Sequence, residues 1–284
     1  MSVLPVALVY SSFMSSCVGC GRELQPGGSP DNICPECRAR AYIKAQEQAR
    51  ASRPSLIKIA PVTSAIIGAN VLVFVGMVLT GASFTTPQIP DLVRWGANTG
   101  VQTLVDQPWR MWTSNYVHIG IVHIALNMWC LWSLGVLAER IFDRWTYFLT
   151  YTFCGIAGSL ASLGLHPNRF GAGASGAIFG MAGALIAALY LGHLPVPPRA
   201  LKSTLKSLIL FAAYNLFFGA VVPAIDNSAH IGGLLCGLIL GAVMAKHLTS
   251  PPEERSSWRN LVFLVSGVVL VGIFFAVRKS VLHA

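Results

Sequence analysis

The sequence predicts an all-α integral membrane protein with a small cysteine-rich head, and three observations support this fold class. Of the 284 residues, 54% are hydrophobic and only 11% are charged. The mean hydropathy is +0.61, which is typical of a membrane-embedded chain and excludes an ordinary soluble domain. Apolar runs near 20 residues, the length that crosses roughly 30 Å of hydrocarbon, recur along the chain. A transmembrane β-barrel would show short alternating segments instead, so we predict helices.

Seven transmembrane helices are predicted from these runs. They cover about 62–80, 117–137, 145–164, 175–192, 205–222, 228–245 and 261–277. The run from Ser175 to about Leu191 is short, because its 17 residues give about 25 Å of helix. Residues 81–116 are too long for a simple connection. Their tryptophans, Trp95, Trp109 and Trp112, predict a segment that lies partly in the membrane interface.

The basic residues predict the orientation in a plasma or inner membrane. With a cytoplasmic N-terminus, 15 of the 20 Lys and Arg residues face the cytoplasm. These are Arg22, Arg38, Arg40, Lys44, Arg50, Arg53, Lys58, Arg140, Arg144, Arg199, Lys202, Lys206, Lys246, Arg255 and Arg259. The positive-inside rule then places the C-terminus outside, after an odd number of spans. The net charge of +9 is explained by topology and by contact with anionic lipid, so we expect no nucleic-acid partner.

The first 16 residues have no basic n-region and no small-residue cleavage site, so no signal peptide is expected.

Two C-x-x-C pairs follow in a Gly, Pro and Ser-rich stretch. They are Cys17, Cys20, Cys34 and Cys37. Four thiolates at this spacing fit a structural zinc and resemble a zinc ribbon. The alternative is two disulfides, which a cytoplasmic location disfavours. A complete sulfur shell leaves no open coordination position, so no catalysis is assigned to the metal.

Ionisable and strongly polar side chains inside predicted spans are few, and by default they mark function. His123 and Asn127 lie four residues apart on one helical face. His118 is expected at the mouth of the same span, where it holds the adjoining loop. Three other cysteines, Cys130, Cys154 and Cys236, are single, and we expect them to serve packing.

Two glycine stripes predict that the fourth and sixth spans pack together. His230 shares a helical bearing with Gly233, Gly237 and Gly241. Ser175 begins a stripe of Gly176, Gly180, Gly183 and Ala187. Close packing of the two helices brings Ser175 beside His230, as a nucleophile beside a general base. The start of a helix also favours a developing oxyanion, to which His123 and Asn127 can donate hydrogen bonds.

Each residue also has a structural interpretation. A lone membrane serine is commonly a helix cap, a histidine at a span mouth can be structural, and an asparagine often joins helices. The coincidence of Ser175, His230, His123 and Asn127 near the same ends of three spans favours the chemical interpretation. No acidic residue lies within a span core, so the sequence predicts a dyad.

Taken together, these residues resemble the rhomboid family of intramembrane serine proteases over about Ser55 to Lys246. The matching motifs are Trp109-Arg110, His118 with His123 and Asn127, Glu139-Arg140, Gly173-Ala-Ser175-Gly176 and Ala229-His230-Ile-Gly-Gly233. The resemblance implies a six-helix core and substrates that are membrane-anchored proteins, cut in or near their transmembrane segments. It also implies a water-filled cavity open to the outer side, lined by His118, His123 and Asn127, and catalysis without a metal or cofactor.

The resemblance further implies a role for each matched residue. Ser175 is the nucleophile, His230 is the base and later the acid, and His123, Asn127 and the Ser175 N–H form the oxyanion hole. Supporting residues are Trp109, Arg110, His118, Gly173, Gly176, Phe179, Gly233 and Gly237. Phe179 replaces a tyrosine that is common in relatives, so we expect it to stack on His230 without a hydrogen bond.

The predicted domains are a zinc-ribbon-like cytoplasmic head at 1–40, a basic linker at 41–60, a six-helix protease domain at 61–250 and an additional C-terminal transmembrane helix at 251–284. The linker is expected near anionic lipid. Whether the head recruits a cytoplasmic partner or gates activity stays open. One alternative function is an inactive rhomboid-like protein that binds transmembrane helices. A transporter is the other, although no internal repeat supports it.

Overall fold

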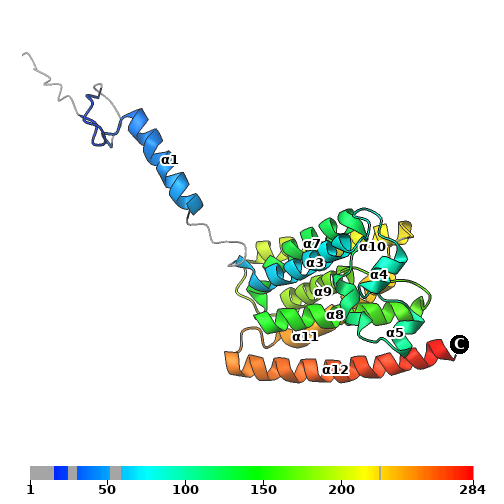
Figure 1. Cartoon of the computed structure of the whole chain (residues 1–284). Helices are drawn as coiled ribbons and strands as arrows, with labels where there is room; N and C mark the ends of the chain where they lie inside the picture. Colours follow the sequence, from blue (N-terminus) through cyan, green and yellow to red (C-terminus); the bar gives the residue numbers. More distant parts are fainter. Residues whose placement is uncertain (1–15, 25–30, 52–58, 224, 284) are drawn as a thin grey trace, which may run out of the picture. The chain divides into compact units, whose positions relative to one another are not determined.

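A computed structural model describes residues 16–24, 31–51, 59–223 and 225–283, and all structural statements concern these ranges (Figure 1). The chain divides into two compact units, Met1–Ser55 and Leu56–Ala284. The boundary falls within the linker predicted at 41–60, and the finer division into four parts stays a prediction. Residues 1–15, for which no signal peptide is expected, lie outside the described residues, as do residues 52–58 of the predicted linker.

The first unit is small and contains one long helix. An isolated antiparallel bridge joins Ser16 to Glu23, and α1 (Pro35–Ala51) follows directly after Cys34. Arg22 and Glu36 form a bidentate ion pair, both bonds 2.9 Å long, that joins the bridge segment to the first turn of α1. This pair is exposed, so its contribution to stability is small.

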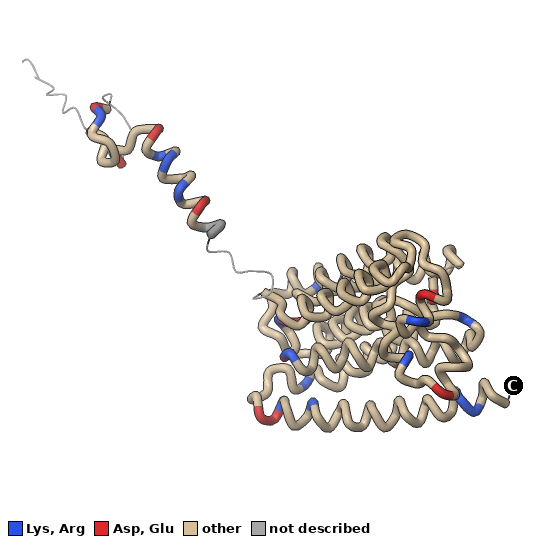
Figure 2. The backbone as a smooth tube through the Cα atoms, viewed as in Figure 1, with Lys and Arg blue, Asp and Glu red and all other residues tan. Residues whose placement is uncertain are grey.

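The second unit contains the seven predicted membrane helices. They are α3 (Pro61–Leu79), α7 (Gly120–Ile141), α8 (Arg144–Leu165), α9 (Ser175–Leu191), α10 (Pro198–Val221), α11 (Asn227–Ala245) and α12 (Pro252–Leu282). Among the described residues, six of them are long and apolar enough to cross a membrane, and α9 is a shorter apolar helix of 17 residues. In this unit, charged residues gather at helix ends and loops while long helical stretches carry none (Figure 2).

Three helices differ clearly from the sequence prediction, and one of them, α10, begins at Pro198 rather than at 205. The other two differ for identifiable reasons. The second span begins at Gly120 rather than near 117, because Gly120 has φ +81° and packs against the Thr85 backbone, where a side chain would overlap. The last helix extends over Pro252–Leu282 rather than 261–277. A search for apolar runs finds only its middle, because its first turns carry Glu253 and Glu254.

The segment at 81–116 folds into four short helices. They are α4 (Ile89–Arg94), α5 (Val101–Val105), α6 (Arg110–Thr113) and the 3-10 helix η1 (Ser114–Tyr116). Trp109 and Trp112 are about half exposed. Trp95 packs on α3 at Gly76, where an added methyl group would meet its ring at 2.5 Å, and its indole N–H donates to Thr80 Oγ1 at 3.1 Å.

Helix α9 is the centre of the second unit, and its residues are buried almost continuously from Gly176 to Leu189. It contacts α7, α8, α10 and α11. An added Cβ at Gly237 would overlap the Gly180 carbonyl, and one at Gly241 would overlap the Ala184 carbonyl. The expected close contact of two small-residue stripes is therefore present. Such backbone approach is a main source of helix association in membranes, where apolar burial drives little.

We expect Gly237→Val to lower stability by about 3 kcal/mol, since its new methyl groups meet α9 backbone that cannot move aside. Gly272→Val on α12 is the matched control, because nothing among the described residues lies within 4 Å of its Cβ position. Thermal unfolding of the two variants in one detergent measures the difference. Equal midpoints for the two variants would contradict the packing argument.

Candidate active site

Ser175 and His230 lie in contact at the ends where α9 and α11 begin. Ser175 is the first residue of α9, and its Oγ lies 2.9 Å from His230 Nε2, within hydrogen-bond distance. His230 lies in the first turn of α11 and is only 7% exposed. This is the geometry in which a ring nitrogen can take a proton from a hydroxyl.

Glycines allow this contact. An added Cβ at Gly233 would overlap the Gly176 carbonyl, so the two helices touch backbone to backbone one turn from the dyad. Gly158 on α8 approaches the same point, since its added Cβ would lie 2.7 Å from the Ala229 carbonyl oxygen. Three helices therefore meet at glycines beside Ser175 and His230.

The imidazole of His230 is held by stacking. The Phe179 ring lies parallel to it, with ring centroids 4.2 Å apart and an interplanar angle of 12°. The expected stacking is present, and phenylalanine has no hydroxyl to add a hydrogen bond. The other ring nitrogen, Nδ1, is buried and has no hydrogen-bond partner among the described residues. No carboxylate therefore orients the ring directly.

His123 presents a donor to the loop before Ser175. Its Nδ1 accepts a hydrogen bond from the Ile119 N–H at 3.1 Å, so the neutral ring carries its proton on Nε2. Gly173 lies against this nitrogen, and a Cβ at Gly173 would approach Nε2 to 2.9 Å. Gly173 also has φ +126°, a conformation that favours glycine, and its N–H donates to the Ser114 carbonyl at 2.9 Å.

Asn127 and the start of α9 supply two further donors. The Asn127 amide donates one hydrogen bond to the His123 carbonyl at 2.9 Å and keeps a second N–H. Ser175 is the first residue of α9, so α9 has no intrahelical acceptor for its N–H. Together with His123 Nε2, these groups could stabilise an oxyanion formed beside Ser175.

These groups share one cavity of about 370 Å³. Its lining includes Asn98, Ser114, Asn115, His123, Asn127, Ser159, Ser162, Phe170, Ser175, Phe179, Phe211, Asn215, Asp226 and His230. Several of these residues belong to η1 and to α8 rather than to the helices that carry the dyad. Their hydroxyl and amide groups add hydrogen-bonding atoms to a lining that is otherwise mostly apolar.

Three supporting residues act at a distance from the dyad. His118 is fully buried and lies beside His123, with ring centroids 5.2 Å apart. We expected His118 to line the cavity, but it is not among the lining residues. Gly120 turns the chain between them, and the His118 ring points back to the Tyr116 carbonyl at 3.3 Å. Arg110 lies over the Trp109 ring and donates to the Val93 and Ala97 carbonyls at 2.7 and 2.9 Å. It holds the segment at 81–116 together.

Glu139 has a similar supporting role at the other end of the bundle. Its carboxylate accepts hydrogen bonds from the N–H groups of Val62 and Thr63, at 3.2 and 2.7 Å. It therefore caps the start of α3 from α7.

The sequence reasoning missed Asp226, although a signal for it exists. Asp226 precedes the first turn of α11 and accepts hydrogen bonds from Ser228 and Ala229, as an N-cap does. An aspartate before an apolar helical run is a recognised start signal, but it does not show which other helix the free carboxylate oxygen meets.

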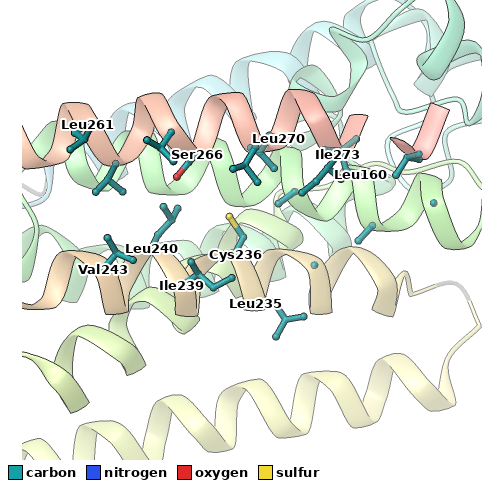
Figure 3. Close-up of a pocket in the computed structure, with 18 of the residues that line it drawn as sticks. Leu160, Leu235, Cys236, Ile239, Leu240, Val243, Leu261, Ser266, Leu270 and Ile273 are labelled. Carbon is teal, nitrogen blue, oxygen red and sulfur yellow. The ribbon is translucent and has the colours of Figure 1, made fainter. Parts of the chain in front are cut away.

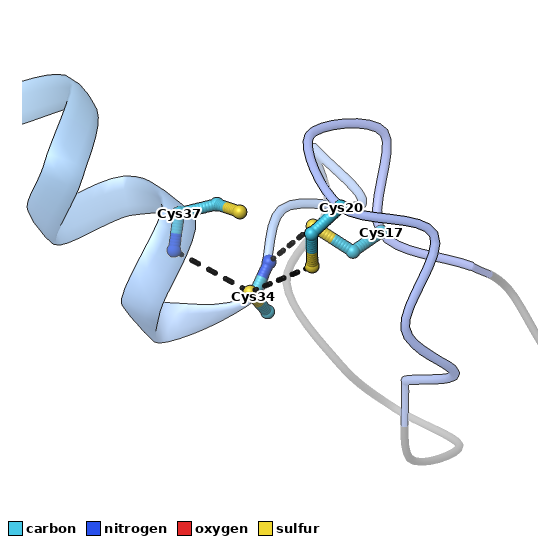
Figure 4. A group of neighbouring side chains, drawn as sticks. All are labelled: Cys17, Cys20, Cys34 and Cys37. Atoms are coloured by element: carbon cyan, nitrogen blue, oxygen red, sulfur yellow. Dashed lines mark hydrogen bonds between the residues drawn. The ribbon is translucent and has the colours of Figure 1, made fainter.

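The four cysteines of the first unit form a compact cluster (Figure 4). All four sulfur atoms lie within 4.8 Å of one another, and none is in a disulfide. The Cys34 N–H donates to Cys17 Sγ at 3.2 Å, and this bond lowers the pKa of Cys17 to about 6. Hydrogen bonding with Cys20 and Cys34 raises the pKa of Cys37 to about 12. A divalent cation would favour the thiolate form of all four, so the cluster is fit to bind a metal.

A larger hollow of about 760 Å³ lies between α11 and α12 and reaches α8 (Figure 3). Leu240, Leu261, Leu270 and Ile273 are typical of its lining, and Ser266 is one of its few polar side chains. None of the described residues that line it is a histidine, a carboxylate or a basic residue. It therefore lacks the acid–base groups of the smaller cavity and is not the candidate active site.

Residues 105–247, just over half of the chain, match the family model described as the Rhomboid domain. The chain belongs to the rhomboid family. The match covers α7 to α11, which contain every group of the candidate dyad and oxyanion site. With its apolar helices, this rhomboid chain is a multi-pass integral membrane protein.

Curated relatives include proteins named as active and as inactive. The chain is 36% identical to rhomboid protease GluP of Bacillus subtilis (strain 168) over 222 residues, 78% of this chain and 41% of that protein. It is 35% identical to RHOMBOID-like protein 4 of Arabidopsis thaliana over 49% of this chain and 34% of that protein. It is 31% identical to inactive rhomboid protein 2 of Homo sapiens over 60% of this chain and 20% of that protein. The chain thus spans less than half the length of each.

Proposed function

We propose that this rhomboid protein is an intramembrane serine protease that hydrolyses peptide bonds in or near the transmembrane segments of membrane-anchored proteins. The observation that carries the proposal is the 2.9 Å contact between Ser175 Oγ and His230 Nε2. The named protease GluP among its relatives supports the same reaction class. Family membership alone does not decide the matter, because an inactive rhomboid also matches.

In the proposed mechanism, Ser175 Oγ attacks the carbonyl carbon of the scissile peptide while His230 Nε2 takes its proton. The Ser175 N–H, His123 Nε2–H and Asn127 amide donate to the oxyanion of the tetrahedral intermediate. The resulting imidazolium gives its proton to the leaving amine. Water then enters the cavity and hydrolyses the acyl-enzyme, with His230 again acting as base. The reaction needs no cofactor.

We further propose a cytoplasmic N-terminus, with the C-terminus and the cavity opening on the opposite side of the membrane. The distribution of Lys and Arg supports this orientation. Helix α9 spans about 25 Å, less than the hydrocarbon core, so Ser175 lies below the surface where a short water path reaches it. Membrane lipid and transmembrane protein substrates are the proposed partners.

For the head, we propose a structural zinc held by Cys17, Cys20, Cys34 and Cys37, and a cytoplasmic partner as the use of the domain. The mutual distances of the four sulfur atoms support the metal. No step of the proposed hydrolysis involves it.

The decisive test is covalent labelling of Ser175 by a fluorophosphonate. We expect labelling of the wild-type protein and its loss in His230→Ala, since an unassisted serine hydroxyl reacts far more slowly. Mass spectrometry of the labelled peptide identifies the residue. A wild-type protein that stays unlabelled while folded would favour a helix-binding role without cleavage. Asn215→Ala serves as the control, because Asn215 lines the same cavity but is not part of the dyad. We expect this variant to remain labelled.

A further inference from the structure

Asp226 controls the first turn of α11, the turn that carries His230. Its carboxylate oxygen Oδ1 accepts the Ser228 and Ala229 N–H groups at 3.1 and 3.2 Å. Its backbone carbonyl accepts the His230 N–H at 3.2 Å. The position of the His230 backbone therefore depends on where Asp226 is held.

A second set of contacts holds this turn to α8. The buried Ser162 hydroxyl on α8 donates to Asp226 Oδ2 at 2.5 Å. Beside it, Ser228 Oγ lies 3.1 Å from Nδ1 of His166, the residue that follows the end of α8. Gly158 of α8 also packs against Gly176, so α8 contacts the start of α9 as well as the start of α11. Asp226 thus links the helix turn that carries His230 to α8, which in turn packs against the start of α9 at Ser175.

Among the described residues that line the cavity, Asp226 is also the one carboxylate. The titratable residues that line the cavity in the described part of the chain are His123, Cys130, Asp226 and His230. The cavity-lining residues of α9 and α10, which include Phe179 and Asn215, are uncharged. The carboxylate lies one helical turn, about 6 Å of rise, from His230. The Asp226 carboxylate favours a positive charge on His230.

We propose that Asp226 is a positioning residue for His230, which fixes the first turn of α11 against Ser162 and stabilises the imidazolium with its charge. The inference rests on the proposed hydrolysis. When Ser175 Oγ bonds to the substrate carbon, its proton moves to His230 Nε2. The Asp226 carboxylate, at the start of the same helix, then stabilises the new positive charge. Asp226 acts through space and through the helix, because no hydrogen bond joins it to the buried Nδ1.

Asp226→Asn removes the negative charge and keeps the helix cap, since asparagine is an equally good N-cap. We expect kcat for a transmembrane reporter to fall roughly tenfold, the effect of one pKa unit at the base, with KM unchanged. The acid limb of the pH–rate profile is expected to move to lower pH. Asp143→Asn is the matched control, because Asp143 caps α8 in the same manner but lies outside the cavity lining. It is expected to keep the wild-type kcat and pH profile.

Ser162→Ala tests the tie to α8 and is available if Asp226→Asn does not fold. It removes the 2.5 Å bond and leaves the charge, so kcat is expected to fall about threefold without a shift of the pH profile. An Asp226→Asn or Ser162→Ala protein with wild-type kcat and pH profile would overturn the positioning role alone. A wild-type protein that neither cleaves nor takes the fluorophosphonate would overturn the proposed function, and the positioning role with it.

Discussion

Ser175→Ala is expected to abolish cleavage of a transmembrane reporter while leaving the helix bundle folded. The hydroxyl is the only proposed nucleophile, and loss of such a group lowers kcat by about 10⁴-fold or more in serine proteases of other folds. His230→Ala is expected to have an effect of the same size, since both residues act in one step. Reconstitution of each variant with the reporter, followed by gel and mass analysis of the products, measures the loss.

Ser133→Ala is the matched control for this experiment. Among the described residues, its hydroxyl donates only to a carbonyl of its own helix, Trp129 O at 2.9 Å, and Ser133 lies outside the cavity lining. We expect wild-type cleavage from it. Normal turnover in Ser175→Ala would place the nucleophile elsewhere. A wild-type protein that inserts, folds and never cuts any reporter would favour the helix-binding alternative.

Removal of one cysteine ligand is expected to release the proposed zinc and unfold the first unit. Structural zinc sites bind with about 10–16 kcal/mol, more than so small a segment gains from apolar burial. Metal analysis of reduced wild-type protein is expected to find one zinc per chain, and Cys17→Ser is expected to have almost none. Circular dichroism of Cys17→Ser should show the loss of α1 signal.

Cys236→Ser is the control for the metal, because Cys236 lines the apolar hollow in the other unit. It is expected to keep its zinc. A reduced wild-type preparation, made with zinc in the medium and found free of metal, would rule out the structural site. Cleavage of the reporter by Cys17→Ser is expected to continue, since no ligand of the cluster takes part in the proposed hydrolysis.

The membrane helices are predictable because bilayer thickness sets their length. Any helix that crosses hydrocarbon must be apolar for nearly 20 residues, so all seven segments stand out in the chain. Their ends are less predictable. Gly120 moves the start of α7 through its backbone conformation, and the charged first turn of α12 conceals the true start of that helix.

Much of the dyad geometry also follows from local pattern. Glycines every fourth residue beside Ser175 and His230 point to one face of each helix, and only a close helix partner explains them. The pairing of α9 with α11 is therefore readable from sequence, as is the Phe179 stack one turn from the nucleophile.

Contacts between segments that share no such pattern needed the tertiary structure. The burial of His118 beneath His123 depends on how the chain turns at Gly120, and the tie between Asp226 and Ser162 joins residues 64 positions apart. A helical period states which side chains share a face, but not which hydroxyl on another helix a carboxylate will meet. Residue types and spacing thus specified the helices and the candidate dyad. The packing of α8 against α11 decided how the turn that carries His230 is held, because the contact between Ser162 and Asp226 arises only when the two helices come together in three dimensions.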